Sequence, residues 1–346
     1  MTTRPHWMLY GATGYTGRRI AERAVALGAR PLLAGRNAAE GQALAQSLGL
    51  PWRTIDLQDT ATLQREVAQC SAVLHAAGPF VHTWQPMAAA CLAGGTHYLD
   101  ITGEIPVYEG LAALDTPARA AHVMLLPGCG FDVVPTDCLA VQLKRRLPDA
   151  TQLDIAISFN GTLTRGTIRS ALAAADPQAQ VRRNHLLQRL PKPRATQFDF
   201  GQGDGPTTVY AVTFGDLSMA WRSTGIPNIA TWLRPTPEFA SLATLTDLAQ
   251  VDARPAGPTA DELAHLPSVF IAQARNAGGV STALRLVTPQ VYALTFDVAA
   301  TLAERVHQGT ARHGFQTPAT VFGEDCILSF DGCTMEDWPA APMDSA

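Results

Sequence analysis

The feature that most constrains the fold is a run of three closely spaced glycines near the N-terminus. Gly11, Gly14 and Gly17 follow an apolar stretch, Trp7–Tyr10, and the last two open an amphipathic stretch, Gly14–Leu27. Glycines at these places allow a tight turn, a close approach of the backbone to a diphosphate, and close packing of the helix on the strand. The free N–H groups at the start of the helix would then bind the phosphates. The pattern therefore predicts a dinucleotide-binding loop.

The first half of the chain alternates short apolar runs with amphipathic stretches. Gly28 and Gly49 follow two of these stretches at the place of a helix C-terminal cap. This alternation is typical of βαβ units, so we expect a Rossmann domain with a doubly wound parallel sheet, whose ligand lies beyond the carboxyl ends of the strands. The expected strands are residues 7–10, 31–34, 52–55, 72–76, 98–101 and 123–126, and the expected helices are 14–27, 38–48, 61–70, 85–93 and 107–120.

After residue 148 the pattern changes to longer alternating segments, which favour a second α+β domain with a mainly antiparallel sheet. We expect a Rossmann domain at 1–148, a substrate or dimerisation domain at 149–309, and a C-terminal segment, 310–346, that could pack back on the first domain. The expected strands are 152–159, 207–214, 228–233 and 282–287; the expected helices are 167–175, 238–249, 260–274 and 289–307; and 190–205 is expected to be a loop or an edge hairpin.

Composition excludes several classes of protein. A chain of 346 residues with 47% hydrophobic residues suits two packed domains. A net charge of −4 without a long basic cluster argues against a nucleic-acid partner. No apolar run is long enough for a membrane span and the N-terminus has no signal-peptide pattern, so we expect a cytoplasmic protein. The six cysteines form no Cys-x-x-Cys pair, and we expect no metal site.

The end of the second expected strand indicates which dinucleotide binds. Enzymes that bind NAD carry an acidic residue there for the ribose 2′-hydroxyl, whereas this chain reads Ala34-Gly35-Arg36-Asn37. Arg36 follows the glycines at the usual distance, and a guanidinium pairs well with a 2′-phosphate. We therefore expect NADP(H) as the cofactor. Alternatively, Arg36 is a solvated arginine that opens the next helix.

Two more strand ends are expected to contact the cofactor. Asp56, after the third strand, could reach the adenine, or it could be a turn or capping residue. The small residues Ala77 and Gly78, after the fourth strand, would let the backbone lie along the ribose and diphosphate. Pro79 and Phe80 would then form a wall beside the nicotinamide, unless they simply pack in the core.

Several of these segments resemble the saccharopine dehydrogenase-like oxidoreductases. The resemblance is carried by Gly11–Gly17, Ala34–Arg36, Ala77–Phe80, Cys91–Glu104 and Pro127–Asp137, and their order is closest to that in the trans-acting enoyl reductase branch. It implies an NADP-dependent reductase with a Rossmann domain and a second α/β domain. Carried onto matching positions, it also implies cofactor contacts at Gly11, Thr13, Gly14, Tyr15, Thr16, Gly17, Arg36, Gly78, Pro79 and Phe80.

Hydride transfer requires polar groups near the nicotinamide, at the carboxyl ends of strands four to six. We expect catalytic residues among Tyr98, Asp100 and Asp132. Asp132 follows two glycines in the loop 127–132 and could orient a substrate or a proton-relaying water, or it could merely cap a glycine turn. Asp137 reads as a first-turn helix residue, and Glu104 could be a surface carboxylate.

The sequence is compatible with two functions. The first is an NADPH-dependent oxidoreductase that reduces a C=C or C=N bond of a small acyl or amino-acid-derived substrate. The second is a non-catalytic NADP(H)-sensing regulator. In either case, apolar antiparallel strands in the second domain would suit a homodimer.

Overall fold

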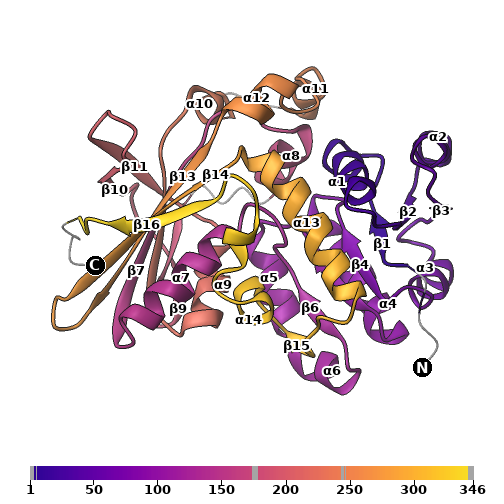
Figure 1. Cartoon of the computed structure of the whole chain (residues 1–346), viewed down its shortest axis with the longest axis horizontal. Helices are drawn as coiled ribbons and strands as arrows, with labels where there is room; N and C mark the ends of the chain where they lie inside the picture. The colour runs from indigo at the N-terminus through magenta and orange to yellow at the C-terminus, as the bar shows by residue number, and fades with distance from the viewer. Residues whose placement is uncertain (1–3, 5, 174–177, 243–244, 246, 342–346) are drawn as a thin grey trace.

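The structure, a computed structural model, describes the chain except residues 1–3, 5, 174–177, 243–244, 246 and 342–346. Two sheets dominate the molecule, one on each side of the long helix α13 (Val291–His307), as Figure 1 shows. The N-terminal sheet lies to the right in that view, and the second sheet lies to the left.

The N-terminal sheet is parallel, in the order β15-β6-β5-β4-β1-β2-β3. The chain starts in the middle at β1, builds one side through β3, and then crosses to β4 on the other side. This reversal creates a switch-point crevice beyond the carboxyl ends of β1 and β4. The strands are β1 (Met8–Tyr10), β2 (Leu32–Gly35), β3 (Trp52–Thr54), β4 (Ala72–His75), β5 (His97–Asp100), β6 (Met124–Leu126) and β15 (Gly314–Phe315).

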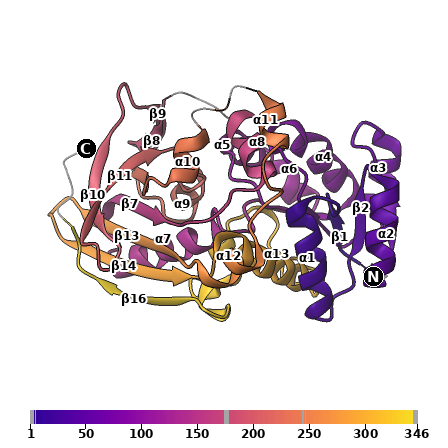
Figure 2. The same cartoon turned by 90° about the horizontal axis from the view of Figure 1, so that it is seen from above.

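Helices cover both faces of this sheet, because each strand is followed by an amphipathic stretch. Figure 2 shows α1 and α13 on one side and α4 and α6 on the other. One stretch differs from expectation, since residues 107–120 form two helices with a break at Ala113–Leu114. The helices are α1 (Tyr15–Ala26), α2 (Ala38–Leu48), α3 (Thr60–Val67), α4 (Trp84–Gly94), α5 (Ile105–Ala112) and α6 (Asp115–Ala120), with a 3-10 turn η1 (Phe80–His82) before α4.

The second sheet is mixed and mainly antiparallel, in the order β10-β11-β12-β7-β13-β14-β16, with β7 and β12 paired in parallel. The fold class expected from the sequence is therefore confirmed. Helices α7 (Val134–Arg146) and α9 (Asp216–Thr224) pack on this sheet. The strands are β7 (Ala150–Ser158), β8 (Gln180–Arg183), β9 (Leu186–Arg189), β10 (Ala195–Asp199), β11 (Pro206–Val212), β12 (Asn228–Leu233), β13 (Ser268–Asn276), β14 (Ser281–Thr288) and β16 (Thr334–Trp338).

The helix expected at 260–274 is wrong. Helix α12 (Ala260–His265) ends before Pro267, and the following residues form β13, which lies between β7 and β14. A residue before proline is disfavoured in the helical region, which ends α12 at this point. The apolar run Val269–Ala272 lacks alternation because the strand is buried on both faces. The hydrophobic pattern of this run therefore fits a buried helix as well as a buried strand.

Other short elements in the second half complete the fold. Helix α8 (Arg165–Ala173) corresponds to the helix expected at 167–175, whose last two residues lie outside the described part of the chain. Helix α9 and the hairpin β8–β9 were not expected from the sequence. The remaining elements are α10 (Pro237–Leu242), α11 (Leu248–Asp252), α14 (Pro318–Phe322) and the 3-10 turn η2 (Cys326–Ser329).

The C-terminal segment contributes a strand to each sheet. β15 extends the parallel sheet beside β6, and the Phe315 N–H donates to Asp115 at 2.8 Å. β16 instead pairs with β14 in the second sheet. The described residues of the segment 310–346 thus contact both parts of the molecule. We propose domain limits at residues 148 and 309.

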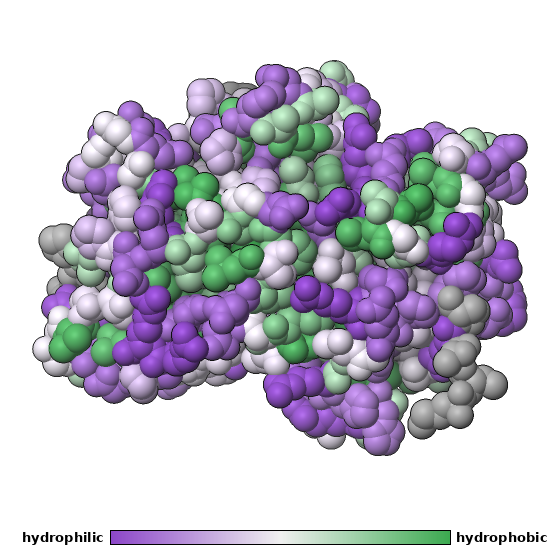
Figure 3. Space-filling view, in the orientation of Figure 1, coloured by the Kyte–Doolittle hydropathy of each residue, from purple (hydrophilic) through white to green (hydrophobic). Residues whose placement is uncertain are grey.

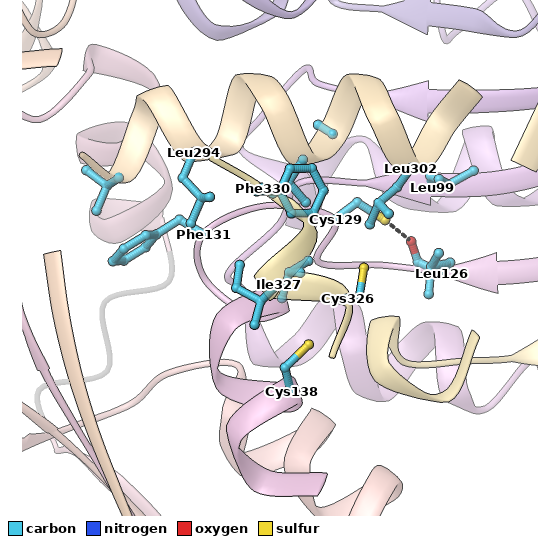
Figure 4. Close-up of a cluster of buried hydrophobic side chains, with 14 of the residues drawn as sticks. Leu99, Leu126, Cys129, Phe131, Cys138, Leu294, Leu302, Cys326, Ile327 and Phe330 are labelled. Atoms are coloured by element: carbon cyan, nitrogen blue, oxygen red, sulfur yellow. Dashed lines mark hydrogen bonds between the residues drawn. The ribbon is translucent and has the colours of Figure 1, made fainter. Parts of the chain in front are cut away.

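Helix α13 joins the two parts into one core. Its Asp297 forms an ion pair with Arg23 of α1 at 2.7 Å, and its Glu304 accepts a hydrogen bond from the Trp7 indole at 3.0 Å. Cys129, Cys138 and Cys326 lie as free thiols among the apolar side chains below α13 (Figure 4). On the face drawn in Figure 3, hydrophilic side chains gather at the periphery and hydrophobic ones towards the middle. No helix in the described residues is long and apolar enough to cross a membrane.

Candidate active site

The three glycines of the N-terminal loop have different structural requirements. Gly11 has φ +89°, and a Cβ there would lie 2.8 Å from the Ala76 backbone. A Cβ on Gly17 would lie 2.2 Å from the Gly11 carbonyl oxygen. At Gly14 the nearest atom to a Cβ would be 3.4 Å away, and φ is −67°. The protein itself therefore requires glycine at 11 and 17, whereas at 14 it leaves room for a side chain.

The start of helix α1 is open to an anion. Its N-cap is Gly14, which has no side chain to accept a hydrogen bond from the first N–H groups, and no acidic residue lies in its first turn. Unsatisfied N–H groups and the positive end of the helix dipole favour a phosphate at this place. The position of this helix start, at the switch point between β1 and β4, fits the diphosphate of a dinucleotide.

Arg36 and Asp56 lie at neighbouring strand ends. Arg36 directly follows β2 and is exposed, and both residues are close enough to influence the pKa of Tyr10, the last residue of β1. Burial raises that pKa to about 12, while the Arg36 charge lowers it and the Asp56 charge raises it. Asp56 also accepts a hydrogen bond from the Gln58 N–H at 3.0 Å, which is the turn role considered from the sequence.

Residues of the glycine loop contact both parts of the molecule. The Tyr15 hydroxyl donates to the Pro258 carbonyl at 2.7 Å, and its ring lies against Gly257. Its side chain is thus held by the second half of the chain, and its backbone belongs to the start of α1. Thr13 lies near Gly35, and Thr16 points into a cavity between the two sheets.

The turn after β4 is fixed by a buried carboxylate. Glu104 accepts hydrogen bonds from the backbone N–H groups of Phe80, at 2.9 Å, and Val81, at 2.7 Å. The Gly78–Pro79 bond in this turn is cis. Only 5% of Glu104 is exposed, so its interpretation as a surface carboxylate is wrong. Glu104 instead holds the segment 77–80 at the crevice where the sequence predicts a nicotinamide wall.

A cavity of about 710 Å³ opens beside this turn. Such a volume suits a small-molecule ligand. The described residues that line it come from both halves of the chain, with Gly78, Phe80, Glu104 and Asp132 on one side and residues of α8, the second sheet and α13 on the other. The second group consists of Thr164, Gly166, Thr167, Ser170, Ala171, Ala179, Gln180, Arg189, Ala211, Val212, Thr213, Phe214, Leu233, Phe239, Tyr292 and Thr295.

Asp132 is the predicted catalytic residue that lines this cavity. It lies beside Gly103, where a Cβ would be 3.0 Å from its Oδ2 atom. Burial raises the pKa of Asp132 to about 6, and the Glu104 charge contributes. Among the described residues no backbone N–H donates to its carboxylate in the manner of a turn cap. A carboxyl group that titrates near neutrality in a cavity is suited to acid–base chemistry.

Tyr98 and Asp100 lie elsewhere. Both side chains are fully buried, and neither is among the residues that line the cavity. The Tyr98 hydroxyl donates to Asp100 at 2.7 Å, and Asp100 also accepts from the backbone N–H groups of Thr102 and Gly128. Burial raises the pKa of Asp100 to about 6. The pair therefore connects β5 to the loop 127–132, and the structure does not favour the catalytic role expected for either residue.

The cavity also contains groups that sequence reasoning missed. Tyr292, from the first turn of α13, and Thr164 and Thr167, from the start of α8, bring three hydroxyls together. Nothing in the sequence of α13 distinguishes Tyr292. Asp137, in contrast, is the first-turn residue expected for α7, and it accepts from the Ala319 N–H at 2.7 Å.

The fold and the cavity define a two-part dinucleotide-binding protein. Residues 7–126 match the family model of the saccharopine dehydrogenase NADP binding domain. The resemblance indicated by the sequence motifs is thus confirmed, and so is NADP(H) as the cofactor of this domain.

The curated relatives of this chain include trans-acting enoyl reductases of mycobacteria. The chain is 37% identical over 153 residues to the enzyme of Mycobacterium bovis, covering 40% of this chain and 35% of that one. A Mycobacterium tuberculosis protein with a provisional name of the same kind is 37% identical over 198 residues, 50% of this chain and 46% of the relative. The chain therefore spans less than half the length of these relatives.

A solved structure shares the whole fold. Apo saccharopine dehydrogenase (L-Glu forming) from Saccharomyces cerevisiae matches with a TM-score of 0.66, covering 96% of this chain and 100% of that chain. The sequences are 11% identical, so this likeness concerns the fold alone.

Proposed function

We propose that this protein is an NADPH-dependent oxidoreductase that reduces a C=C or C=N bond of an acyl or amino-acid-derived substrate. The observation that carries the proposal is the position of the cavity. It begins at Thr16, Gly78 and Phe80, beside the expected cofactor groove, and it contains the Asp132 carboxyl group. A nicotinamide against Phe80 would therefore face a cavity in which a substrate carbon fits at about 3 to 3.5 Å.

The relatives support the reductase class. They are named trans-acting enoyl reductases, and an enoyl group contains a C=C bond of the proposed kind. Because the chain spans less than half of the relatives, the choice between C=C and C=N depends on experiment.

The second candidate is a regulator that senses NADP(H) without catalysis. An exposed Arg36 and an open helix start would serve a sensor as well as an enzyme. A sensor needs room only for the cofactor, however, and the cavity of about 710 Å³ extends from the expected cofactor contacts Gly78 and Phe80 to residues of the second sheet, which favours the enzyme.

The test is NADPH consumption by the purified chain with three kinds of acceptor: enoyl thioesters, ketones, and 2-oxo acids mixed with amines. We expect consumption with an enoyl thioester or an imine-forming mixture, with the reduced product identified by mass spectrometry. Tight NADPH binding without consumption for any acceptor would instead support the sensor. The variant Gly14→Val serves as a control, since it should remove cofactor binding and with it any true turnover.

A further inference from the structure

Three hydroxyls meet at the start of helix α8. The Thr164 side chain accepts from the Thr167 N–H at 3.1 Å, and its oxygen lies 3.0 Å from the Thr167 hydroxyl. The Thr167 hydroxyl lies 2.8 Å from the Tyr292 hydroxyl, which also accepts from the Thr164 N–H at 2.9 Å. All three residues line the cavity.

The two hydroxyl–hydroxyl contacts of this cluster can run in either direction. In the direction that a ligand in the cavity would favour, Thr164 donates its hydroxyl hydrogen to the Thr167 oxygen. Thr167 can then donate to Tyr292 Oη. With an N–H and an O–H donating to it, both acceptor positions of the phenol oxygen are filled, and its hydrogen is left for a further acceptor. Thr164 and Thr167 are the described residues that hydrogen-bond with Tyr292 Oη.

The loop with Asp132 lies beside the same part of α13. Thr295, three residues after Tyr292, accepts a hydrogen bond from the Phe131 N–H at 3.2 Å. Burial raises the pKa of Tyr292, and the Asp132 charge contributes. The phenol therefore keeps its hydrogen at neutral pH, next to a carboxyl group that shares the cavity.

The charges around the cavity restrict its ligand. Glu104 and Asp132 supply two carboxyl groups near the expected nicotinamide position, and the exposed Arg189 of β9 is the cationic residue among the described lining residues. A ligand carboxylate placed near Glu104 and Asp132 would be repelled. A protonated imine nitrogen has no lone pair to accept the phenol hydrogen, whereas a carbonyl oxygen does.

We infer that the cavity binds a neutral carbonyl compound, and that the Tyr292 hydroxyl donates a hydrogen bond to its oxygen. This assignment narrows the proposed function, and rests on it, by selecting a C=C bond conjugated to a carbonyl over a C=N bond. Reduction of such a bond adds a hydride, which NADPH would supply, to the β carbon and a proton, which water would supply, to the α carbon. A donor at the carbonyl oxygen would stabilise the negative charge that lies there between the two transfers. Tyr292 is thereby a catalytic residue.

The test uses a saturated probe, so that binding is measured without turnover. The probe is the butyryl thioester of N-acetylcysteamine with a 13C-labelled carbonyl, added to the chain together with NADP+. Difference infrared spectroscopy should show a lowered C=O frequency with the parent chain and a frequency close to the value in an apolar solvent with Tyr292→Phe. The variant should also bind the probe roughly 2- to 12-fold more weakly, the range of one neutral hydrogen bond.

The control variant is Tyr108→Phe, whose buried hydroxyl donates to the Thr102 carbonyl outside the cavity. This variant should leave the frequency unchanged, and the melting temperatures of both variants show whether the fold is kept. An identical C=O frequency with the parent chain and with a folded Tyr292→Phe would overturn the role of Tyr292. Failure of the parent chain to bind the probe would overturn the carbonyl site.

A second arm tests the charge of the ligand. The dicarboxylates glutarate and 2-oxoglutarate should bind at least tenfold more weakly than the neutral probe, and tighter binding of either one would contradict the neutral class. These results stay separate from the proposed function. A chain that binds the thioester through Tyr292 but never consumes NADPH keeps the carbonyl site and loses the proposed reductase activity.

Discussion

At the scale of single residues, the glycine loop separates structural from ligand-related requirements. Gly11 and Gly17 have backbone neighbours at 2.8 Å and 2.2 Å from an added Cβ, so they are needed for the loop to form. Gly14 has no such neighbour within 3.4 Å. A phosphate that lies against Gly14 would explain why this residue has no side chain. The sequence pattern alone does not separate this ligand-related requirement from the structural requirements at Gly11 and Gly17.

The variant Gly14→Val should therefore abolish the binding of both NADPH and NADH while the chain stays folded. Its side chain would occupy the place of the diphosphate and not that of another protein atom. Calorimetric titration measures the binding, and circular dichroism monitors the fold. The matched variant Gly17→Val should lose the fold itself. Retained NADPH affinity in Gly14→Val would show that the phosphates bind elsewhere.

The exposed Arg36 gives a prediction about cofactor choice. Arg36→Ala should weaken NADPH binding by roughly one to two decades, because a hydrogen bond to a charged group contributes about 1.5 to 3 kcal/mol. NADH lacks the 2′-phosphate, so its binding should change little. Arg65→Ala, which removes an exposed arginine from α3, is the control. An equal loss for both cofactors would mean that Arg36 has a structural role.

Asp132 gives a prediction about turnover and pH. Asp132→Asn keeps the shape of the side chain but cannot carry charge, so turnover should fall by on the order of 10² or more while NADPH binding is kept. With its pKa at about 6, the carboxylate is the main form above that pH. If the carboxylate orients the substrate, parent activity should fall as the pH drops through about 6, and the remaining activity of the variant should lack this decline. Unchanged turnover would remove Asp132 from the mechanism.

At the scale of the elements, local patterns predict the N-terminal half far better than the second half. Each strand there is followed by its own amphipathic helix, so neighbours in the sequence are neighbours in space. The sequence pattern of β13 predicts a helix because the strand is buried on both faces. That burial comes from α7 and from a cluster that includes Phe198 and Phe200, which are distant in the sequence. The site divides in the same way. Arg36 and the glycines lie in one local motif, whereas Thr164 and Tyr292 meet across 128 positions.

Helix α9 carries a buried acid that yields a stability prediction. Asp216 is fully buried, and among the described residues neither carboxylate oxygen forms a well-aligned hydrogen bond, while Thr136 lies near enough to lower its pKa in part. Burial raises the pKa of Asp216 to about 8, well above the value of about 3.9 for an unfolded chain. The folded chain thus retains a proton that the unfolded chain loses between these two pH values. The stability from this group is complete below about pH 4 and declines as the pH rises to about 8.

Asp216→Asn cannot ionise, so it should lack this decline. From pH 5 to pH 8, the free energy of unfolding of the variant should rise relative to that of the parent by up to about 1.4 kcal/mol for each pH unit. Urea denaturation of both chains across this range measures the difference. Parallel curves would contradict the raised pKa.

At the scale of the whole molecule, α13 is the element that makes one site from two sheets. Its first turn supplies Tyr292 to the cavity, and its middle and end bind Arg23 and Trp7 of the N-terminal part. The cavity therefore forms between parts that share a continuous core, which suits a preformed substrate site. A homodimer stays a prediction, and sedimentation velocity tests it.

The central claim is that a hydride passes from NADPH to a substrate in this cavity. The most direct measurement uses NADPH with deuterium at the reactive carbon of the nicotinamide and a neutral enoyl thioester as acceptor, with mass spectrometry of the product. We expect a saturated thioester that carries one deuterium at the β carbon, and a fall of this product by on the order of 10² or more in Asp132→Asn. Tight NADPH binding with no deuterium in any product, across thioesters, ketones and imine-forming mixtures, would contradict it.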